Sequence, residues 1–198
     1  MDEVLDNDRH IIEEIRSGQT RRYAVLIDRH KDRAMTLALR LTGNRQESEE
    51  LVQDAFLRAY RSLDQFRGDA KFGTWFYRIL YNLCLTRVTR RKGKPEQLDV
   101  SDERMLDNIL VDEEEATIQE RMEEDEMQHM IASEIAGMPE KFRTVLTLFY
   151  VQEMSYEEIT AVLNQPLGTV KTNLFRARNL LRGRVLAGMK GEMKVACR

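Results

Sequence analysis

The sequence is poor in residues that cross-link, bend or interrupt a polypeptide. Its 198 residues include only two cysteines, three prolines and one tryptophan. Cys84 and Cys197 form no CxxC pair, and they form no metal-ligand cluster with His10, His30 or His129. This usage of cysteine favours a reducing, cytoplasmic compartment, and we expect Cys84 to be an inert core residue. The sequence indicates neither a disulfide framework nor a metal site.

Long apolar runs and secretion signals are also missing. No segment approaches the roughly 20 apolar residues that span a bilayer, and residues 1–8 are acidic rather than basic and apolar. Aromatics make up 7% of the chain, charged residues 33%, and no alternating strand pattern of useful length occurs. That composition is typical of helices. The sequence predicts an all-α protein, two small helical domains joined by an acidic linker, without direct insertion in a membrane.

The net charge of −3 hides a strong asymmetry along the chain. Residues 96–126 hold fourteen acidic and two basic side chains, so this stretch carries −12 and the rest of the chain carries +9. Two basic bodies joined by an acidic segment fit a protein whose domains contact phosphate. The acidic segment either lies in a basic channel of a partner or only serves solubility, and the sequence leaves both alternatives open.

The C-terminal third has the pattern of two short helices around a tight turn. Ser155 and Glu158 have the spacing of a capping box, flanked by Met154 and Ile159 at the spacing of a hydrophobic staple. Pro166 is well placed to open the second helix. No acidic residue occurs between residues 166 and 184. In the second helix Val170, Leu174, Ala177 and Leu181 should face inward, and Lys171, Phe175, Arg178 and Arg182, with Thr172, Arg176 and Asn179 beside them, should face outward.

A helix that is buried on one face and basic on the other fits the major groove of DNA. The alternative is an ordinary helical hairpin with a solvated basic face, although such faces usually mix charges of both signs. The pattern therefore predicts a DNA-reading helix-turn-helix.

Four helices are expected upstream, in residues 1–92. Gly43 is expected to end the second helix as a left-handed cap, and Asn44 and Glu47 to cap the third. His30 lies on or near the apolar face of the second helix, where we expect a packed histidine rather than a ligand. The apolar stripes comprise Ile11, Ile12 and Ile15 in the first helix, Tyr23, Ile27, Ala34, Leu37 and Leu41 in the second, and Val52, Phe56, Ala59 and Leu63 in the third.

The third helix, expected over residues 47–63, also has a mostly polar side. Leu57 is an apolar residue there, and the pattern alone leaves two interpretations open. It is either an incidental exposed leucine or part of a contact with a partner helix. The residues that lie outside the apolar stripe or at its edges are Leu51, Gln53, Asp54, Leu57, Arg58 and Arg61.

The loop over residues 64–73 and the fourth helix, expected over 74–91, mix aromatic and basic side chains. Rings that stack on bases and cations that hold the backbone suit exposed single-stranded nucleic acid. Trp75, Phe76 and Ile79 are expected to be core residues instead. The residues expected to contact nucleic acid are Arg67, Lys71, Phe72, Arg78, Tyr81, Asn82, Arg87 and Arg90.

Two parts of the chain resemble one known family. Residues 138–159 and the helix-turn-helix resemble region 4 of bacterial sigma factors, and residues 50–60 and 66–79 are similar to region 2 of the two-domain, extracytoplasmic-function class. The resemblance implies region 2 at 1–92, an acidic linker at 93–117, region 4 at 118–184 and a tail at 185–198, which we expect to fray.

The resemblance also implies a function, that of a promoter-specificity subunit of RNA polymerase, with promoter DNA and the β′ clamp helices and β flap of the core polymerase as partners. It further implies control by an anti-sigma factor, which could hold this otherwise cytoplasmic protein at the membrane. The implied −35 contacts are Lys171, Thr172, Phe175, Arg176, Arg178 and Arg182, the −10 contacts are the eight residues of the loop and fourth helix, and the polymerase contacts are the six on the third helix.

Two other classes of function remain open at this stage. A dimeric helix-turn-helix regulator that needs no polymerase would explain the helix-turn-helix, but not the surface of Gln53, Asp54 and Leu57 or the basic, aromatic fourth helix. A nucleic-acid enzyme would need an active site, and the sequence has no glycine-rich phosphate loop and no Cys/His pair at a plausible spacing. We therefore expect a protein that is not an enzyme and that needs no cofactor.

Overall fold

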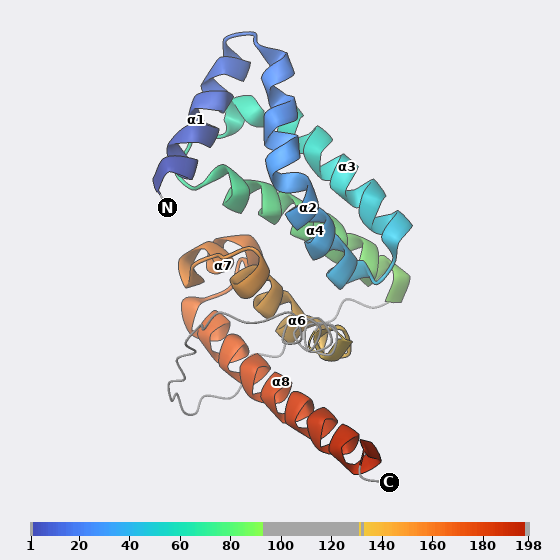
Figure 1. Ribbon diagram of the computed structural model, residues 1–198. Coiled ribbons are helices and arrows are strands. Elements are labelled where there is room, and N and C mark those ends of the chain that lie inside the picture. Colours follow the sequence, from blue (N-terminus) through green and yellow to red (C-terminus); the bar gives the residue numbers. More distant parts are fainter. Residues whose placement is uncertain (1, 93–130, 132, 197–198) are drawn as a thin grey trace.

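The computed structural model describes residues 2–92, 131 and 133–196. Throughout these residues the regular secondary structure is helical and no strand occurs, which confirms the all-α prediction. The helices form two groups that lie beside one another, one from the N-terminal half of the chain and one from the C-terminal part (Figure 1).

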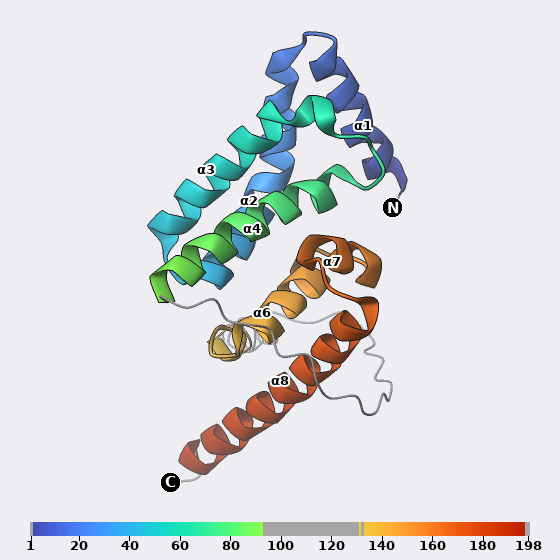
Figure 2. The same cartoon turned by 180° about the vertical axis from the view of Figure 1, so that it is seen from behind.

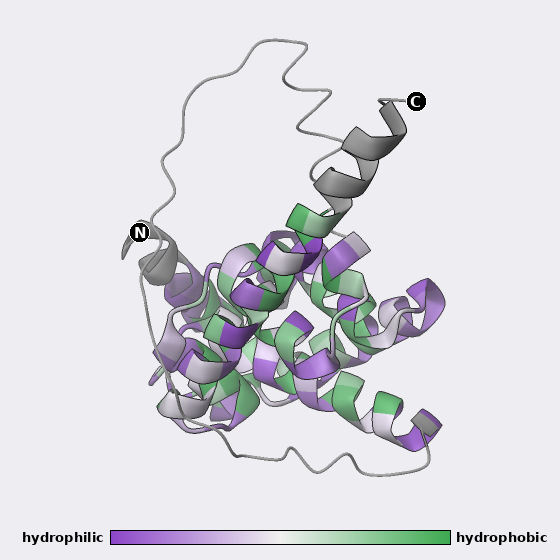
Figure 3. Cartoon of the chain, turned by 90° about the horizontal axis from the view of Figure 1, so that it is seen from below, coloured by the Kyte–Doolittle hydropathy of each residue, from purple (hydrophilic) through white to green (hydrophobic). Residues whose placement is uncertain are grey.

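The first group contains α1 (Asp2–Arg16), α2 (Tyr23–Thr42), α3 (Arg45–Arg61) and α4 (Phe72–Lys92), with short 3₁₀ turns at Thr20–Arg22 and Leu63–Gln65. Figure 3 shows hydrophobic residues, in green, mixed with hydrophilic ones, in purple, along the helices. The expected inward residues of α1 and α3 are all buried, namely Ile11, Ile12, Ile15, Val52, Phe56, Ala59 and Leu63.

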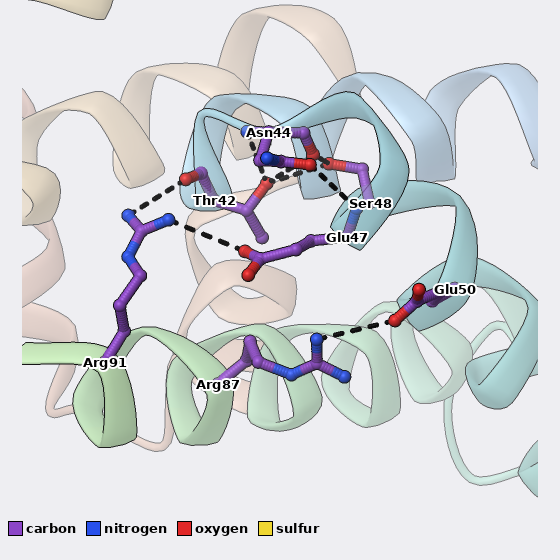
Figure 4. Close-up of polar contacts among 7 residues, drawn as sticks. All are labelled: Thr42, Asn44, Glu47, Ser48, Glu50, Arg87 and Arg91. Carbon is purple, nitrogen blue, oxygen red and sulfur yellow. Dashed lines mark hydrogen bonds and ion pairs between the residues drawn. The ribbon is translucent and has the colours of Figure 1, made fainter.

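The turn between α2 and α3 has the predicted caps at Gly43 and Asn44, but the Glu47 side chain does not cap α3. The Asn44 N–H donates to the Thr42 hydroxyl at 3.2 Å instead, and the Glu47 carboxylate pairs with Arg91. Gly43 adopts a left-handed φ of 68°, and the Asn44 side chain accepts a hydrogen bond of 2.9 Å from the backbone N–H three residues on. The Thr42 and Ser48 hydroxyls lie 2.8 Å apart beneath this cap. Arg91 of α4 donates to the Thr42 carbonyl at 3.1 Å, so the end of α4 is tied to the turn (Figure 4).

An aromatic core fills the space between α2, α3 and α4. The Phe76 ring is fully buried and stacks on Phe56, with ring centroids 4.4 Å apart. The Phe72 ring lies on its other side, at 6.0 Å. Burying one such side chain stabilises a fold by about 1.5–3 kcal/mol. Cys84 is buried in the same core, and this burial raises the pKa of its thiol to about 12, which confirms the prediction of an inert residue.

His30 sits in a polar pocket that ties α1 to α2 and α4. Its Nε2 atom lies 3.1 Å from Asp8 Oδ2, and its Nδ1 atom lies 3.5 Å from the Tyr77 hydroxyl. Arg29 donates to the other oxygen of Asp8 at 2.7 Å. Burial alone would raise the pKa of the Asp8 carboxyl, but the hydrogen bonds and positive charges of His30 and Arg29 hold that pKa below its usual value. The prediction of a packed, satisfied His30 is confirmed.

The second group follows a helical stretch at residues 133–136. It contains α6 (Glu140–Leu146), a π-helical turn η3 (Thr147–Val151), α7 (Tyr156–Leu163) and α8 (Leu167–Ala196). Pro139 precedes the first residue of α6, as the sequence indicates. The centre of this group is apolar, with Val145, Leu148, Ile159 and Leu174 at most 1% exposed.

The two groups touch along two lines. Helix α4 packs against α7, and α2 packs against α6 and η3. Figures 1 and 2 show the helix-turn-helix lying below α4 from opposite sides. This packing brings the first helix of the helix-turn-helix, α7, against α4.

Two expectations concern the linker and the tail. The acidic linker at 93–117 and the methionine-rich segment at 118–130 lie outside the described residues. The tail differs from the expectation of fraying, because α8 continues past Gly183 to Ala196. Leucine, alanine, methionine and lysine, which favour helices, outweigh the interspersed glycines there.

None of the described helices combines the length and the apolar character that crossing a bilayer requires.

We predict that Asp8→Asn removes a pH-dependent part of the stability. Because the pKa of Asp8 is lower in the folded than in the unfolded state, its contribution is present above the unfolded value and is lost as the pH falls through the folded value. The variant should lose about 1–3 kcal/mol near neutral pH. Urea unfolding should show a flatter pH profile below about pH 4 than for the wild type.

The control for this experiment is Asp28→Asn, whose side chain is 69% exposed. This variant should follow the wild-type profile. A profile for Asp8→Asn as steep as that of the control would contradict the role given to the Asp8 pocket.

Candidate nucleic-acid interface

The helix-turn-helix begins with the predicted capping box. The Ser155 hydroxyl accepts a hydrogen bond of 3.2 Å from the backbone N–H of Glu158, and the Glu158 carboxylate accepts one of 2.8 Å from the backbone N–H of Ser155. Met154 and Ile159, the two residues of the hydrophobic staple, are both buried. The start of α7 is therefore fixed by local sequence alone.

The turn between α7 and α8 is set by Asn164. This residue ends α7 with a left-handed φ of 53°, and its backbone N–H donates to the carbonyl of Thr160. Asparagine tolerates this conformation better than most residues. The Pro166 carbonyl then accepts from the Val170 N–H at 3.1 Å, which makes the first turn of α8. This turn sets the direction of α8 relative to α7.

Helix α8 has the two faces that the sequence predicts. Val170, Leu174 and Ala177 are at most 1% exposed and pack inward, and Leu181 is partly buried against the core. The opposite face is open to solvent over its basic residues. Lys171 and Arg182 are exposed, and Thr172, Phe175, Arg176 and Arg178 are partly exposed.

Arg178 is held by two aromatic rings that sequence reasoning missed. Its guanidinium carbon lies 4.9 Å from the centroid of the Phe149 ring and 5.4 Å from that of Tyr150. Lys171 lies similarly over Tyr156, at 5.8 Å. Such cation–π contacts orient a positive side chain without neutralising it. Tyr150 is 57% exposed. In the sequence, only its position near a basic helix could have indicated a contact with Arg178.

The polar side of α3 is exposed as expected, with one correction. Leu57 is 55% exposed, and beside it Asp54 forms an ion pair of 3.0 Å with Arg58. Gln53 and Arg61 are exposed on the same helix. Leu51, however, is only 4% exposed and belongs to the core. The helix period places it one turn before Ala55, which is fully buried, and so it faces inward.

The loop before α4 is anchored by two arginines that the sequence did not single out. Arg9 donates to the carbonyl of Gly68 at 2.9 Å, and Arg16 donates to the carbonyls of Leu63 and Phe66. Gly68 has a left-handed φ of 78°, and a β-carbon there would lie 3.0 Å from the Arg9 guanidinium. Helix α1 therefore fixes the shape of this loop.

Two of the expected nucleic-acid contacts are buried. Phe72 is 3% exposed and packs among His30, Phe66 and Trp75, and Tyr81 is 8% exposed. Burial, and then the charge of Glu140 on α6, raises the pKa of Tyr81 to about 12. The sequence pattern assigned both rings to the surface because it could not show packing between distant segments, which for Phe72 comes from His30 and Phe66 and for Tyr81 includes α6.

The remaining expected contacts in the loop and on α4 lie at or near the surface. Arg67, Lys71, Arg78, Asn82 and Arg90 are exposed. The side chain of Asn82 lines a shallow pocket of about 320 Å³ between α3 and α4, together with Arg58 and Ser62.

Carboxylates of α3 hold the basic end of α4. Arg87 forms an ion pair of 3.5 Å with Glu50, and Arg91 one of 3.5 Å with Glu47 (Figure 4). The Arg87 and Arg91 side chains remain 41% and 52% exposed. Partly exposed pairs of this kind are weak, so these cations stay available to another anion.

The loop before α4 meets the helix-turn-helix directly. The Lys71 ammonium lies 3.0 Å from Glu158, whose carboxylate also accepts a hydrogen bond of 3.3 Å from the Thr74 hydroxyl. Burial alone would raise the pKa of Glu158, but the Ser155 N–H, Lys71 and Thr74 together lower it. The carboxylate that caps α7 is thus ionised and faces the expected −10 loop.

We predict that Ser155→Ala lowers the stability by about 1 kcal/mol, because it leaves a first-turn N–H of α7 without its partner. The exposed Ser133 offers a matched control, and Ser133→Ala should change the unfolding midpoint far less. Urea unfolding of both variants measures this difference in stability. Equal midpoints would mean that the capping box does not stabilise the helix-turn-helix.

Comparison with known families supports this geometry. The family model described as Sigma-70 region 2 matches residues 26–94, which include α2, α3 and α4. The one described as Sigma-70, region 4 matches residues 128–181, which include the helix-turn-helix. The exposed faces of α3 and α4 thus fall within the first matched region, and the second includes the basic face of α8 up to residue 181, one residue before Arg182.

Individual relatives match over nearly the whole chain. The ECF RNA polymerase sigma factor SigW of Bacillus subtilis (strain 168) is 35% identical over 182 residues, which cover 86% of this chain and 92% of that protein. The RNA polymerase sigma-H factor of Pseudomonas aeruginosa is 33% identical, with 89% and 92% covered. The ECF RNA polymerase sigma-E factor of Escherichia coli (strain K12) is 30% identical, with 90% and 94% covered.

Solved structures share the fold. CnrH, in complex with the cytosolic domain of CnrY, superposes with a TM-score of 0.63 at 24% identity, covering 91% of this chain and 97% of that one. The sigma factor RpoE from Bartonella quintana, in complex with the anti-sigma factor NepR, gives 0.60 at 19% identity, covering 82% and 96%. With two family models in the expected order and relatives matched along their length, the chain belongs to the extracytoplasmic-function sigma factors, which direct RNA polymerase to promoters.

Proposed function

We propose that α8 reads the −35 element as duplex, while the loop before α4 and α4 itself hold the single strand of the −10 element. The observation that carries this proposal is the two-faced α8, fully buried over Val170, Leu174 and Ala177 and acid-free and basic on its open side. The helix-turn-helix fixes this face so that it can enter a major groove.

The side chains of α8 divide by chemistry. Lys171, Thr172, Phe175 and Arg176 lie on the first turns and are proposed to contact base edges, where arginine suits guanine and apolar groups suit the thymine methyl. Arg178 and Arg182 lie further along and are proposed to contact phosphates. The rings of Phe149 and Tyr150 would hold Arg178 in place for such a contact.

The −10 strand is proposed to follow the exposed residues Arg67, Lys71, Arg78, Asn82 and Arg90, with Arg87 beside them. Pulling a base from the stack costs a few kcal/mol, and stacking on an aromatic side chain returns about 1–3 kcal/mol per base. Trapping of splayed bases can therefore open the duplex without ATP. Phe72 and Tyr81 can take part in stacking only after the packing that buries them has loosened.

Binding to core polymerase is proposed for the open side of α3. Leu57 supplies an exposed apolar group, Asp54 and Arg58 supply a charged pair, and Gln53 and Arg61 flank them. Tyr60, which is 41% exposed, extends the same surface. The β′ clamp helices are the proposed partner here, and the β flap that of the second helical group. The core residue Leu51 would support this surface from within.

An anti-sigma factor is the proposed regulator. The fold shared with Bartonella RpoE, which was solved in complex with the anti-sigma factor NepR, supports this proposal. We further propose a cytoplasmic protein that acts by binding rather than by catalysing a reaction. A dimeric regulator independent of polymerase, the alternative that the sequence left open, would leave the open side of α3 without a partner.

We predict different effects for two arginines of α8. Arg176→Ala should weaken binding to a −35 duplex by about 1–3 kcal/mol and relax the preference at one base pair. Arg182→Ala should weaken binding to all duplexes alike and lower the salt slope by about 1. Fluorescence anisotropy on matched and scrambled duplexes measures both effects. Equal losses on the two duplexes for Arg176→Ala would falsify its base-reading role.

We predict that Asp54→Lys combined with Leu57→Asp abolishes co-purification with core polymerase while the protein stays folded. Both side chains lie at the surface, so the thermal midpoint should change little. The control carries the same two changes elsewhere on the surface, as Asp28→Lys with Leu186→Asp, and should bind normally. Wild-type recovery of polymerase by the α3 variant would assign the interface to another surface.

A further inference from the structure

Helix α1 holds the backbone of the loop before α4 at two neighbouring points. The Arg16 guanidinium donates to the carbonyl of Phe66, and the Arg9 guanidinium donates to the carbonyl of Gly68 at 2.9 Å. The two carbonyls belong to the residues directly before and directly after Arg67. Two side chains from a distant helix therefore fix the backbone on both sides of one proposed strand contact.

Arg16 holds more of the loop than this one carbonyl. Its Nη2 atom also lies 2.7 Å from the carbonyl oxygen of Leu63 and 3.4 Å from that of Asp64. Both residues belong to the 3₁₀ turn that precedes the loop. The contact therefore joins the end of α1 to the end of that turn, and it supplies a donor to carbonyls at the end of a short helix, which need partners.

Gly68 allows Arg9 to come close. Its φ of 78° lies in the left-handed region, and a β-carbon there would lie 3.0 Å from Nη2 of Arg9. A side chain at position 68 would strain the backbone and push against the guanidinium. Glycine at 68 and arginine at 9 are therefore matched to one another.

Helix α1 is itself a firm support. Ile11, Ile12 and Ile15 are at most 7% exposed. The Asp8 carboxylate accepts a hydrogen bond from Arg29 at 2.7 Å and lies 3.1 Å from His30. These contacts join α1 to α2, so the two arginines are held by an element that belongs to the core of the first helical group.

The loop combines a held backbone with exposed cations. Phe66 and Phe72 are 8% and 3% exposed, whereas the side chains of Arg67 and Lys71 lie at the surface. A segment that is ordered before binding avoids the entropy that a ligand would otherwise lose in ordering it. The hydrogen bonds from α1 thus prepare the loop for a strand without occupying its exposed side chains.

We propose that Arg9 and Arg16 are positioning residues for the capture of the −10 strand. They act through the loop, because they hold its backbone so that Arg67 and Lys71 meet the strand in one arrangement. One fixed arrangement fits some base sequences better than others, so the two arginines set the selectivity among −10 sequences as well as the rate of opening. This proposal rests on the strand-binding role given to the loop.

The test uses Arg9→Met and Arg16→Met, each in the full chain bound to core polymerase. Methionine keeps an unbranched side chain and has no donor. The control, Arg21→Met, removes the same charge from an exposed arginine in the turn after α1. Arg9→Lys returns the charge and a donor, and it should recover part of any loss. Arg9 is exposed, so if urea unfolding shows that Arg16→Met does not fold, Arg9→Met carries the test.

Two measurements are made on each variant. Hydrogen exchange of the free protein measures how well the loop is ordered, and the amides of residues 64–71 should exchange about tenfold faster in Arg9→Met and Arg16→Met than in the control. Open-complex formation is followed by 2-aminopurine fluorescence on a promoter identified by run-off transcription, and on copies with one base changed in the −10 element. A base change should slow the wild type and the control about tenfold, and the two variants about threefold or less.

Three results would overturn the proposal. Faster exchange with unchanged discrimination between promoters would mean that the two arginines serve only the fold. Slower opening by the same factor on every promoter, or weaker discrimination without faster exchange, would mean that they contact the strand directly. Exchange and opening that both match the control would mean that the loop does not need these hydrogen bonds.

Failure of this proposal is distinguishable from failure of the proposed function. The variant that decides between them is Arg67→Ala combined with Lys71→Ala. If it opens promoters at the wild-type rate, the loop does not hold the −10 strand and the proposed function itself fails there. If it opens them slowly while Arg9→Met and Arg16→Met behave like the control, the function stands and the positioning role is removed.

Discussion

The carboxylate of Glu158 connects the local structure of this protein to its domain packing. It completes the capping box that starts α7, and it forms the ion pair with Lys71 and the hydrogen bond with Thr74 that join the two helical groups. Without the capping box the first turn of α7 would lose partners for its N–H groups, and α8 is positioned by α7. One ionised side chain therefore contributes both to the position of the recognition helix and to the contact between the two helical groups.

Charge in this sigma factor is arranged so that cations are held but not neutralised. Glu50, Glu153 and Glu158 each pair with a cation that remains about 40–50% exposed, and Arg178 is oriented by rings instead of carboxylates. Exposed pairs are weak, and a DNA strand offers many phosphates at once, with counterion release as the driving force. The basic surfaces are thus preorganised for DNA.

Local sequence was sufficient for the helices and caps, because their causes lie within a few residues. The Ser155–Glu158 box, the left-handed Gly43 and the buried stripe of α8 follow from spacing alone. Contacts between distant segments did not follow. The burial of Phe72 and Tyr81 depends on helices far along the chain, and the anchoring of the loop by Arg9 and Arg16 joins residues nearly 60 and about 50 positions apart. The sequence pattern placed Leu51 outside the buried face of α3, because that face was defined by only four residues. The buried face is wider, since α2 and α4 both pack against α3.

The central claim is that this chain gives core RNA polymerase its choice of promoter. Run-off transcription with purified core polymerase and genomic fragments, followed by mapping of the start sites, tests it most directly. The account predicts discrete transcripts that appear only when the chain is added, with start sites that share a −35 motif and a −10 motif at constant spacing. Transcripts that are the same without the chain, or specific DNA binding as a dimer with no effect on core polymerase, would contradict it.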